Sequence, residues 1–252
     1  MLPLRSNFQN PHISSMKWSQ FFTSAVGRKI VMALTGFFLI SFLVVHVGLN
    51  ACIFNDLSFF NPDDNGSMFN RAAHFMGNTL IIRIMEIGLF AGLLLHIFQG
   101  YAIEIKNRSM RGQGYKVNLG NRGSKWYSRS MALLGTIILL FLIIHVSHFW
   151  VPSRITHNLD PVTYGYTETH NVFLKMFDVF QNPIVVILYV LGVIALAYHL
   201  FHGFHSAFRT MGVHNRKYLA LLKTVGYGFT IVVAVLFILM PLSMFFQWVS
   251  PF

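Results

Sequence analysis

Four histidines each lie in a long apolar stretch of their own, about fifty residues from the next. They are His46, His96, His145 and His199, and each is nearer the C-terminal end of its stretch than the middle. An imidazole in hydrocarbon needs a partner, and ionisable side chains at membrane depth almost always face a bundle interior and serve a function. One histidine in each of four helices is the pattern of a set of metal ligands.

The composition indicates a membrane protein. Of 252 residues, 54% are hydrophobic and 11% are charged, whereas soluble domains carry about 25% charged residues. A bilayer core of roughly 30 Å needs about 20 apolar residues at 1.5 Å each. Five stretches qualify, at 30–53, 79–103, 130–151, 183–206 and 224–248. We therefore expect an all-α membrane protein with five transmembrane helices in a single domain over 1–252. The loops 54–78 and 152–182 have room only for short surface helices.

The residues before the first stretch predict an interfacial helix over 16–27. Its apolar positions have the spacing of a helix with one apolar face: Trp18, Phe21, Phe22, Ala25 and Val26. The stretch at 30–53 is too long for a signal peptide and lacks an Ala-x-Ala-like exit, so we expect it to remain in the mature chain.

The charges predict the orientation. The N-terminus and the loops 104–129 and 207–223 hold fifteen of the nineteen Lys and Arg residues. By the positive-inside rule the N-terminus is cytoplasmic and the C-terminus is outside. The net charge of +11 suits anionic lipid or an acidic cytoplasmic partner. Nucleic acid is not expected, because no basic, aromatic-interleaved soluble domain is present.

The direction of each helix sorts the histidines into two levels. Helices one and three run outward, so His46 and His145, each about seven residues from a helix end, lie roughly 10 Å inside the outer boundary. Helices two and four run inward, so His96 and His199 share a level on the cytoplasmic side. Two histidines at one level, from two helices of a bundle, can hold a six-coordinate haem. The two levels are on the order of 10 Å apart.

The cysteine count restricts the type of haem. Cys52 is the one cysteine, so the chain has no internal disulfide, no cysteine-rich iron–sulfur site and no Cys-x-x-Cys-His motif for covalent haem. We therefore predict two haem b groups in a bundle of helices one to four. Gly36 and Gly135, each ten residues before a histidine, give a porphyrin room or serve helix packing. A metal transporter is the other metal-binding alternative, although transporters usually show midplane carboxylates or broken helices.

Further polar residues lie near the two levels. Arg83 and Glu86 form an acid–base pair within helix two, and are interpreted as a buried ion pair, as part of a quinone site near the outer haem, or as both. His148 lies one turn outside His145 and is assigned to the surroundings of the quinone or of the outer haem. Four residues are assigned to contacts with the inner haem propionates or the cytoplasmic side: Arg28, Lys29, His202 and His205.

Four segments resemble the cytochrome b subunit of succinate dehydrogenase or fumarate reductase, in its five-helix, two-haem form. They are GRKIVMALTGFFLISFLVVHVGLN, HIFQGYAIEIKNRSMR, LIIHVSHFW and YHLFHGFHSAFRTMG. The resemblance implies that His96 and His199 bind a proximal haem and that His46 and His145 bind a distal one. It also implies a flavoprotein and an iron–sulfur partner on the cytoplasmic face, electron transfer to or from a quinone, usually menaquinone, and a bacterial inner membrane. Ala197 stands where some relatives carry a proton-conducting glutamate, which puts that route in doubt.

Two other functions remain open at this point. One is a two-haem cytochrome b that serves a formate dehydrogenase or a hydrogenase. The other is a membrane anchor without redox function. Haem content distinguishes a membrane anchor without redox function from the two kinds of cytochrome b. The identity of the co-purifying subunits distinguishes a cytochrome b of formate dehydrogenase or hydrogenase from one of succinate dehydrogenase or fumarate reductase.

Overall fold

The computed structural model describes residue 22 and residues 24–111 and 125–251. Most of the expected interfacial helix, at 16–21 and 23, lies outside the described residues. Ala25 and Val26, its last apolar positions, instead belong to the first turn of the long helix α2 (Ala25–Asn50). The hydroxyl of Ser24 accepts a hydrogen bond from the Gly27 amide at 2.9 Å, so the helix has an N-cap at Ser24.

Five helical segments are long and apolar enough to cross a membrane, as expected. The long helices after α2 are α4 (Leu80–Arg111), α6 (Met131–His145), α9 (Pro183–Thr210) and α10 (Arg216–Phe245). The full segments are longer than the expected spans, at 25–56, 80–110, 131–154, 183–210 and 216–245. The difference arises because a helix continues through polar residues to its cap, whereas hydropathy marks only the apolar part. Asn182 and Asn215 provide such caps for α9 and α10.

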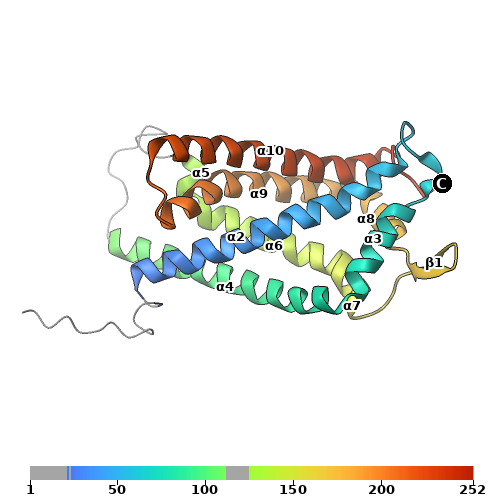
Figure 1. Ribbon diagram of the computed structural model, residues 1–252, viewed down its shortest axis with the longest axis horizontal. Coiled ribbons are helices and arrows are strands. Elements are labelled where there is room, and N and C mark those ends of the chain that lie inside the picture. The colour runs from blue at the N-terminus through green and yellow to red at the C-terminus, as the bar shows by residue number, and fades with distance from the viewer. Residues whose placement is uncertain (1–21, 23, 112–124, 252) are drawn as a thin grey trace, which may run out of the picture.

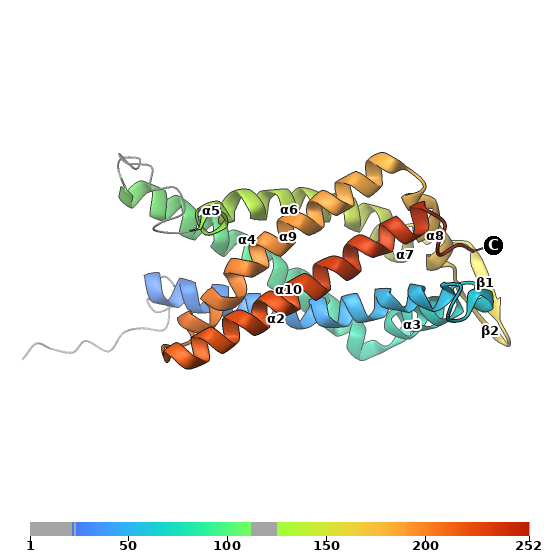
Figure 2. The ribbon, with the colours of Figure 1, turned by 90° about the horizontal axis from the view of Figure 1, so that it is seen from above.

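Four of these helices pack in a ring. Helix α2 contacts α4 and α9, and α6 contacts α9 and α4, so α2 lies diagonally opposite α6, and α4 opposite α9. Helix α10 packs along the outside of α9, as Figure 2 shows from above. The expected grouping of helices one to four is thus observed as packing, with the fifth helix outside it.

A small folded cap covers one end of the bundle, which is called the cap end below (Figure 1). It contains the 3-10 helices η1 (Ala51–Asp56) and η2 (Pro62–Asp64), the helices α3 (Ser67–Asn78) and α8 (Val172–Phe180), and the antiparallel strands β1 (Pro161–Tyr164) and β2 (Thr167–His170). The structure is mostly helical, as predicted, and the hairpin is a short addition that the all-α prediction did not include. Thr and Tyr in β1 and β2 suit strands, with Gly165 at positive φ in the turn.

Buried residues hold the cap against the bundle. Ile53, Phe173 and Met244 are fully enclosed and belong to one apolar cluster. Asn70 is also fully buried, and its side chain bonds to the Tyr164 hydroxyl at 2.8 Å and to the Phe173 amide at 2.9 Å. Burial raises the pKa of Tyr164, and its hydroxyl donates to the Asn65 carbonyl at 3.0 Å. The cap is therefore a packed element with its own polar interior.

The opposite end of the bundle is called the basic end. It holds the start of α2, the ends of α4 and α9, the start of α10 and the short helix α5 (Trp126–Arg129). Its described cations are Arg28, Lys29, Lys106, Arg108, Lys125, Arg129, Arg209, Arg216, Lys217 and Lys223. The acids Asp56, Asp63, Asp64, Asp160, Glu168 and Asp178 lie at the cap end. The two ends therefore differ in charge as the sequence indicated, and the membrane orientation stays a prediction.

Candidate functional site

The four histidines meet as two pairs across the ring of helices. The ring centroids of His46 on α2 and His145 on α6 are 5.7 Å apart, with an interplanar angle of 88°. Those of His96 on α4 and His199 on α9 are 6.2 Å apart, at 62°. Each pair therefore joins diagonally opposite helices, and the structure brings together the residues that helix direction had paired.

The separations suit one metal ion bound between two imidazoles. Such an arrangement places the ring centres about 6 Å apart, because each metal–nitrogen bond is about 2 Å and a ring nitrogen lies about 1 Å from the ring centre. Nδ1 of His145 and Nδ1 of His199 are buried without a hydrogen-bond partner among the described residues. The fit rests on the ring separation, because iron bound at Nε2 would leave these Nδ1 atoms as they are. The residues present therefore fit the predicted pair of axial haem ligands.

Glycines lie beside the pair at the basic end. A Cβ added at Gly36 on α2 would lie 3.7 Å from Cε1 of His96, and one added at Gly135 on α6 would lie 4.0 Å from Cε1 of His199. Gly192 on α9 accommodates Phe141, whose ring a Cβ would meet at 2.5 Å. Gly36 and Gly135 thus keep space open next to histidines, whereas Gly192 serves helix packing.

The other two histidines have hydrogen-bond partners on Nδ1. Thr35 Oγ1 lies 3.0 Å from Nδ1 of His96, and Asn50 Nδ2 lies 3.3 Å from Nδ1 of His46. Asn50 Nδ2 also donates to the His46 carbonyl at 2.8 Å. Neither partner was predicted from the sequence, although Thr35 next to Gly36 and Asn50 one turn after His46 are detectable by helical spacing.

His148 lies near the cap-end pair, in contact with α9. It belongs to η3 (Val146–Trp150), a π-helical turn that directly follows His145. Nδ1 of His148 is 3.0 Å from the hydroxyl of Tyr189, and the two rings are stacked at 9°. Tyr189 is buried and its ring also lies 5.9 Å from that of His145. His148 thus borders the surroundings of His145, with Tyr189 as a neighbour that the sequence did not reveal.

The expected pairing of Arg83 with Glu86 is wrong. Nε of Arg83 donates to the Gly77 carbonyl at 3.0 Å and the side chain is exposed. Glu86 Oε2 instead lies 3.5 Å from Nε of Arg154, in the short helix α7 (Val151–Arg154). Trp150 Nε1 donates to the same carboxylate, so Glu86 has two partners from the segment that follows α6.

A change of helical phase explains this correction. The π-helical turn η3 adds a residue to one turn and so rotates the following residues by about 100° relative to a regular helix. Trp150 at the end of this turn and Arg154 one turn after it both face Glu86 on α4. Within the described ranges, His148 and Glu86 share no hydrogen bond or ion pair, so the three residues assigned to the outer quinone site lie in two separate groups.

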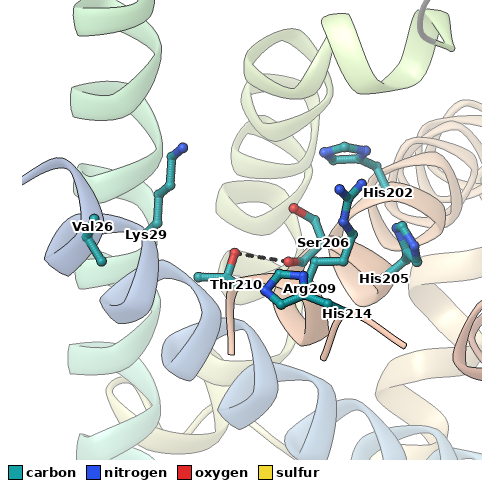
Figure 3. Close-up of a pocket in the computed structure, with 8 residues that line it drawn as sticks. All are labelled: Val26, Lys29, His202, His205, Ser206, Arg209, Thr210 and His214. Carbon is teal, nitrogen blue, oxygen red and sulfur yellow. Dashed lines mark hydrogen bonds between the residues drawn. The ribbon is translucent and has the colours of Figure 1, made fainter. Parts of the chain in front are cut away.

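A pocket of about 420 Å³ opens at the basic end (Figure 3). Lys29 lines it from α2, and His202 and His205 line it from α9, as three of the four residues assigned there. Arg28 is not among the lining residues. The others are Val26, Ser206, Arg209, Thr210 and His214. The lining contains cations, imidazoles and hydroxyl groups but no carboxylate, so the pocket favours an anion.

No family model, curated protein or solved structure matches this chain in the comparisons made. Over the described part of the chain, no group of three or more His, Cys, Asp or Glu residues is arranged to hold a metal ion. A haem needs only two protein ligands, because the porphyrin supplies the other four nitrogens. The histidine pairs therefore carry the functional argument.

Proposed function

We propose that the chain is the membrane-anchor cytochrome b subunit of a succinate:quinone oxidoreductase, with two haem b groups between an iron–sulfur partner and membrane quinone. The observation that carries the proposal is the pairing of His46 with His145 and of His96 with His199 across a bundle of membrane-spanning helices. The segments around the histidines supply the family through their resemblance to the succinate dehydrogenase and fumarate reductase anchors.

The histidines hold and orient the haem groups in this proposal. Bound haem iron supplies reversible one-electron chemistry at each level. His96 and His199 would hold the proximal haem nearer the basic end, and His46 and His145 the distal haem nearer the cap. The apolar helix surfaces around each pair exclude water, which restricts access to the iron.

The basic end is the proposed docking face for the flavoprotein and iron–sulfur subunits. Its cations attract an acidic partner and orient it before contact. The pocket at Lys29, His202 and His205 would receive the carboxylate groups of the proximal haem, with Arg209 as a further cation. A bacterial inner membrane, with this end in the cytoplasm, follows from the positive-inside rule.

Glu86 is the proposed proton donor and acceptor for a quinone at the cap end, of the menaquinone type usual in the family. Arg154 keeps the carboxylate from being an unpaired buried charge, and Trp150 orients it. Arg83 is left out of this site because its guanidinium bonds the Gly77 carbonyl. The position of Glu86 on α4 places it toward the same end of the bundle as His46 and His145.

A reduced-minus-oxidised absorption spectrum of the purified complex tests the proposal, together with identification of its subunits. Two b-type components and a flavoprotein and iron–sulfur partner with succinate oxidation activity are expected. A preparation without b-type absorption would leave the non-redox anchor. Two haems with formate dehydrogenase or hydrogenase subunits would favour the other cytochrome b family.

A further inference from the structure

The chain contains two copies of one helical pattern. The segment ALTGFFLISFLVVHV at 33–47 aligns without gaps with ALLGTIILLFLIIHV at 132–146, and HIFQG at 96–100 aligns with HLFHG at 199–203. The first copy is therefore α2 followed by α4, and the second is α6 followed by α9. Each copy contributes one histidine to each of the two pairs.

The contacts repeat along with the sequence. Gly36 and Gly135 occupy the same position in the two copies, and each faces the histidine of the next long helix, His96 or His199. The two Cβ-to-Cε1 distances, 3.7 Å and 4.0 Å, are nearly equal. The register of α2 against α4 therefore matches that of α6 against α9, so residues at equivalent positions have equivalent neighbours.

The equivalence breaks at the residue that precedes each of these glycines. Thr35 precedes Gly36 and its Oγ1 lies 3.0 Å from Nδ1 of His96. Leu134 precedes Gly135, is 4% exposed and has no polar side-chain atom. Nδ1 of His199 is accordingly buried without a partner within the part of the chain that the structure describes. His96 and His199 thus differ in the partner of Nδ1, and the difference arises from one residue in each copy.

The backbone determines the direction of the hydrogen bond at Thr35. Its hydroxyl lies 2.9 Å from the Val31 carbonyl and 3.1 Å from the Met32 carbonyl, so its one hydrogen is donated back into α2. Thr35 Oγ1 must then accept from the Nδ1–H group of His96. With its proton on Nδ1, the ring has its lone pair on Nε2, the nitrogen that remains for a metal.

We propose that Thr35 is a positioning residue for His96, fixing its tautomer and ring orientation, and that His199 lacks this support because Leu134 stands in the equivalent place. The proposal rests on the proposed haem function. A hydrogen bond accepted from the distant ring nitrogen raises the basicity of a ligating imidazole. Thr35 should therefore favour ferric over ferrous iron at the proximal haem and leave the distal haem unaffected.

The test compares Thr35→Val with Thr35→Ser in the full complex. Valine keeps the shape and removes the acceptor, whereas serine keeps the hydroxyl. The readout is the midpoint potential of each haem from a spectroscopic redox titration, with the proximal haem identified as the component lost in His199→Ala. We expect Thr35→Val to reduce the preference for ferric iron about tenfold, which raises that potential by ~59 mV for a one-electron couple. Thr35→Ser should stay near the wild-type value.

Leu134→Thr is a second, independent test, because it places a hydrogen-bond acceptor beside His199. It should lower the potential of the same haem. If Thr35→Val binds both haems and their potentials are unchanged, the inference is overturned while the proposed function stands. If the valine variant does not assemble, unchanged potentials in Leu134→Thr have the same meaning. A wild-type complex without b-type absorption would overturn both.

Discussion

Glu86 on α4 and Arg154 on α7 form a cross-helix ion pair, with Oε2 and Nε 3.5 Å apart and both side chains one-fifth exposed. Trp150 adds a hydrogen bond to the same carboxylate, and its ring packs edge-on against Phe90 of α4 at 5.1 Å. The Gly77 carbonyl accepts hydrogen bonds from both Arg83 and Arg154. The Glu86 carboxylate is thereby held in one place with the Arg154 guanidinium beside it.

The first prediction concerns this ion pair. Glu86→Gln preserves shape and hydrogen bonding to Trp150 but removes the exchangeable proton, so quinone turnover should fall about 100-fold, the lower end for a lost general acid–base group. Succinate oxidation with an artificial dye by the partner subunits, and the content of both haems, should persist. Steady-state assays with quinone and with dye measure the difference.

Arg83→Gln and Arg154→Gln provide the matched comparison. The Arg154 variant should slow quinone turnover because it leaves the Glu86 carboxylate without its cation. The Arg83 variant should have a near wild-type rate, since its guanidinium contacts only a carbonyl among the described groups. Equal loss in both variants, or wild-type quinone kinetics in Glu86→Gln, would place the quinone site elsewhere.

The second prediction concerns the histidine pairs. His96→Ala and His199→Ala should each remove the same b-type component, because the two rings face each other 6.2 Å apart. His46→Ala and His145→Ala should remove the other component. Low-temperature absorption spectra of the four variants distinguish the components. Loss of one shared component in His46→Ala and His96→Ala would show that the pairing is wrong.

Periodicity and charge predicted the features that depend on long regular helices. The five apolar helices, the opposite charges of the two ends and the meeting of His46 with His145 and of His96 with His199 all follow from helix direction and a rise of 1.5 Å per residue. Such features average over many residues, so small errors at the boundaries do not change them.

Features that depend on local irregularity were not predictable in the same way. Arg154 reaches Glu86 because of the π-helical turn at 146–150, and nothing in a hydropathy pattern indicates that turn. The β-hairpin at 161–170 is only two four-residue strands, too short for a clear alternation. Tyr189 lies next to His148 through the packing of α9, which the sequence alone does not define.

The third prediction concerns helix packing at the cap-end pair. Gly192→Ala would place a Cβ 2.5 Å from the Phe141 ring, whose centroid lies 5.6 Å from that of His145. Displacing this ring should destabilise the protein by about 1–3 kcal/mol and lower the content of the distal haem more than that of the proximal one. Thermal unfolding in detergent and haem quantification measure both effects.

Gly88→Ala is the control for this substitution. A Cβ at Gly88 meets nothing within 4 Å, so alanine should leave stability unchanged or raise it by up to about 1 kcal/mol through helix propensity. If the two variants have the same melting temperature, close packing of Phe141 against Gly192 does not contribute to stability.

The fourth prediction concerns docking at the basic end. Lys29→Gln and Arg209→Gln should slow association with the soluble partner subunits, and the wild-type rate should fall with added salt because exposed charges are screened beyond about 8 Å at physiological ionic strength. Association rates with the chain in liposomes measure this. Lys175→Gln, at the cap end, is the matched control. A larger effect of Lys175→Gln would reverse the docking face.

The fifth prediction concerns the polar interior of the cap. Asn70 is fully buried, donates to the Tyr164 hydroxyl and Asn171 Oδ1, and accepts from the Phe173 amide. Leucine has a similar size but makes none of these bonds, and each buried group left unpaired costs about 1–3 kcal/mol. Asn70→Leu should therefore loosen the hairpin and α8, seen as faster hydrogen exchange over 161–180.

The His96–His199 pair lies toward the basic end, away from this network, so the proximal haem spectrum should not change in Asn70→Leu. Asn78→Leu, in the same helix but exposed and bonded to His74, should leave exchange over 161–180 at the wild-type rate. Equal protection in the two variants would mean that the apolar cluster around Phe173 and Met244 holds the cap without the Asn70 network, because burial of those side chains would then suffice to keep the hairpin and α8 in place.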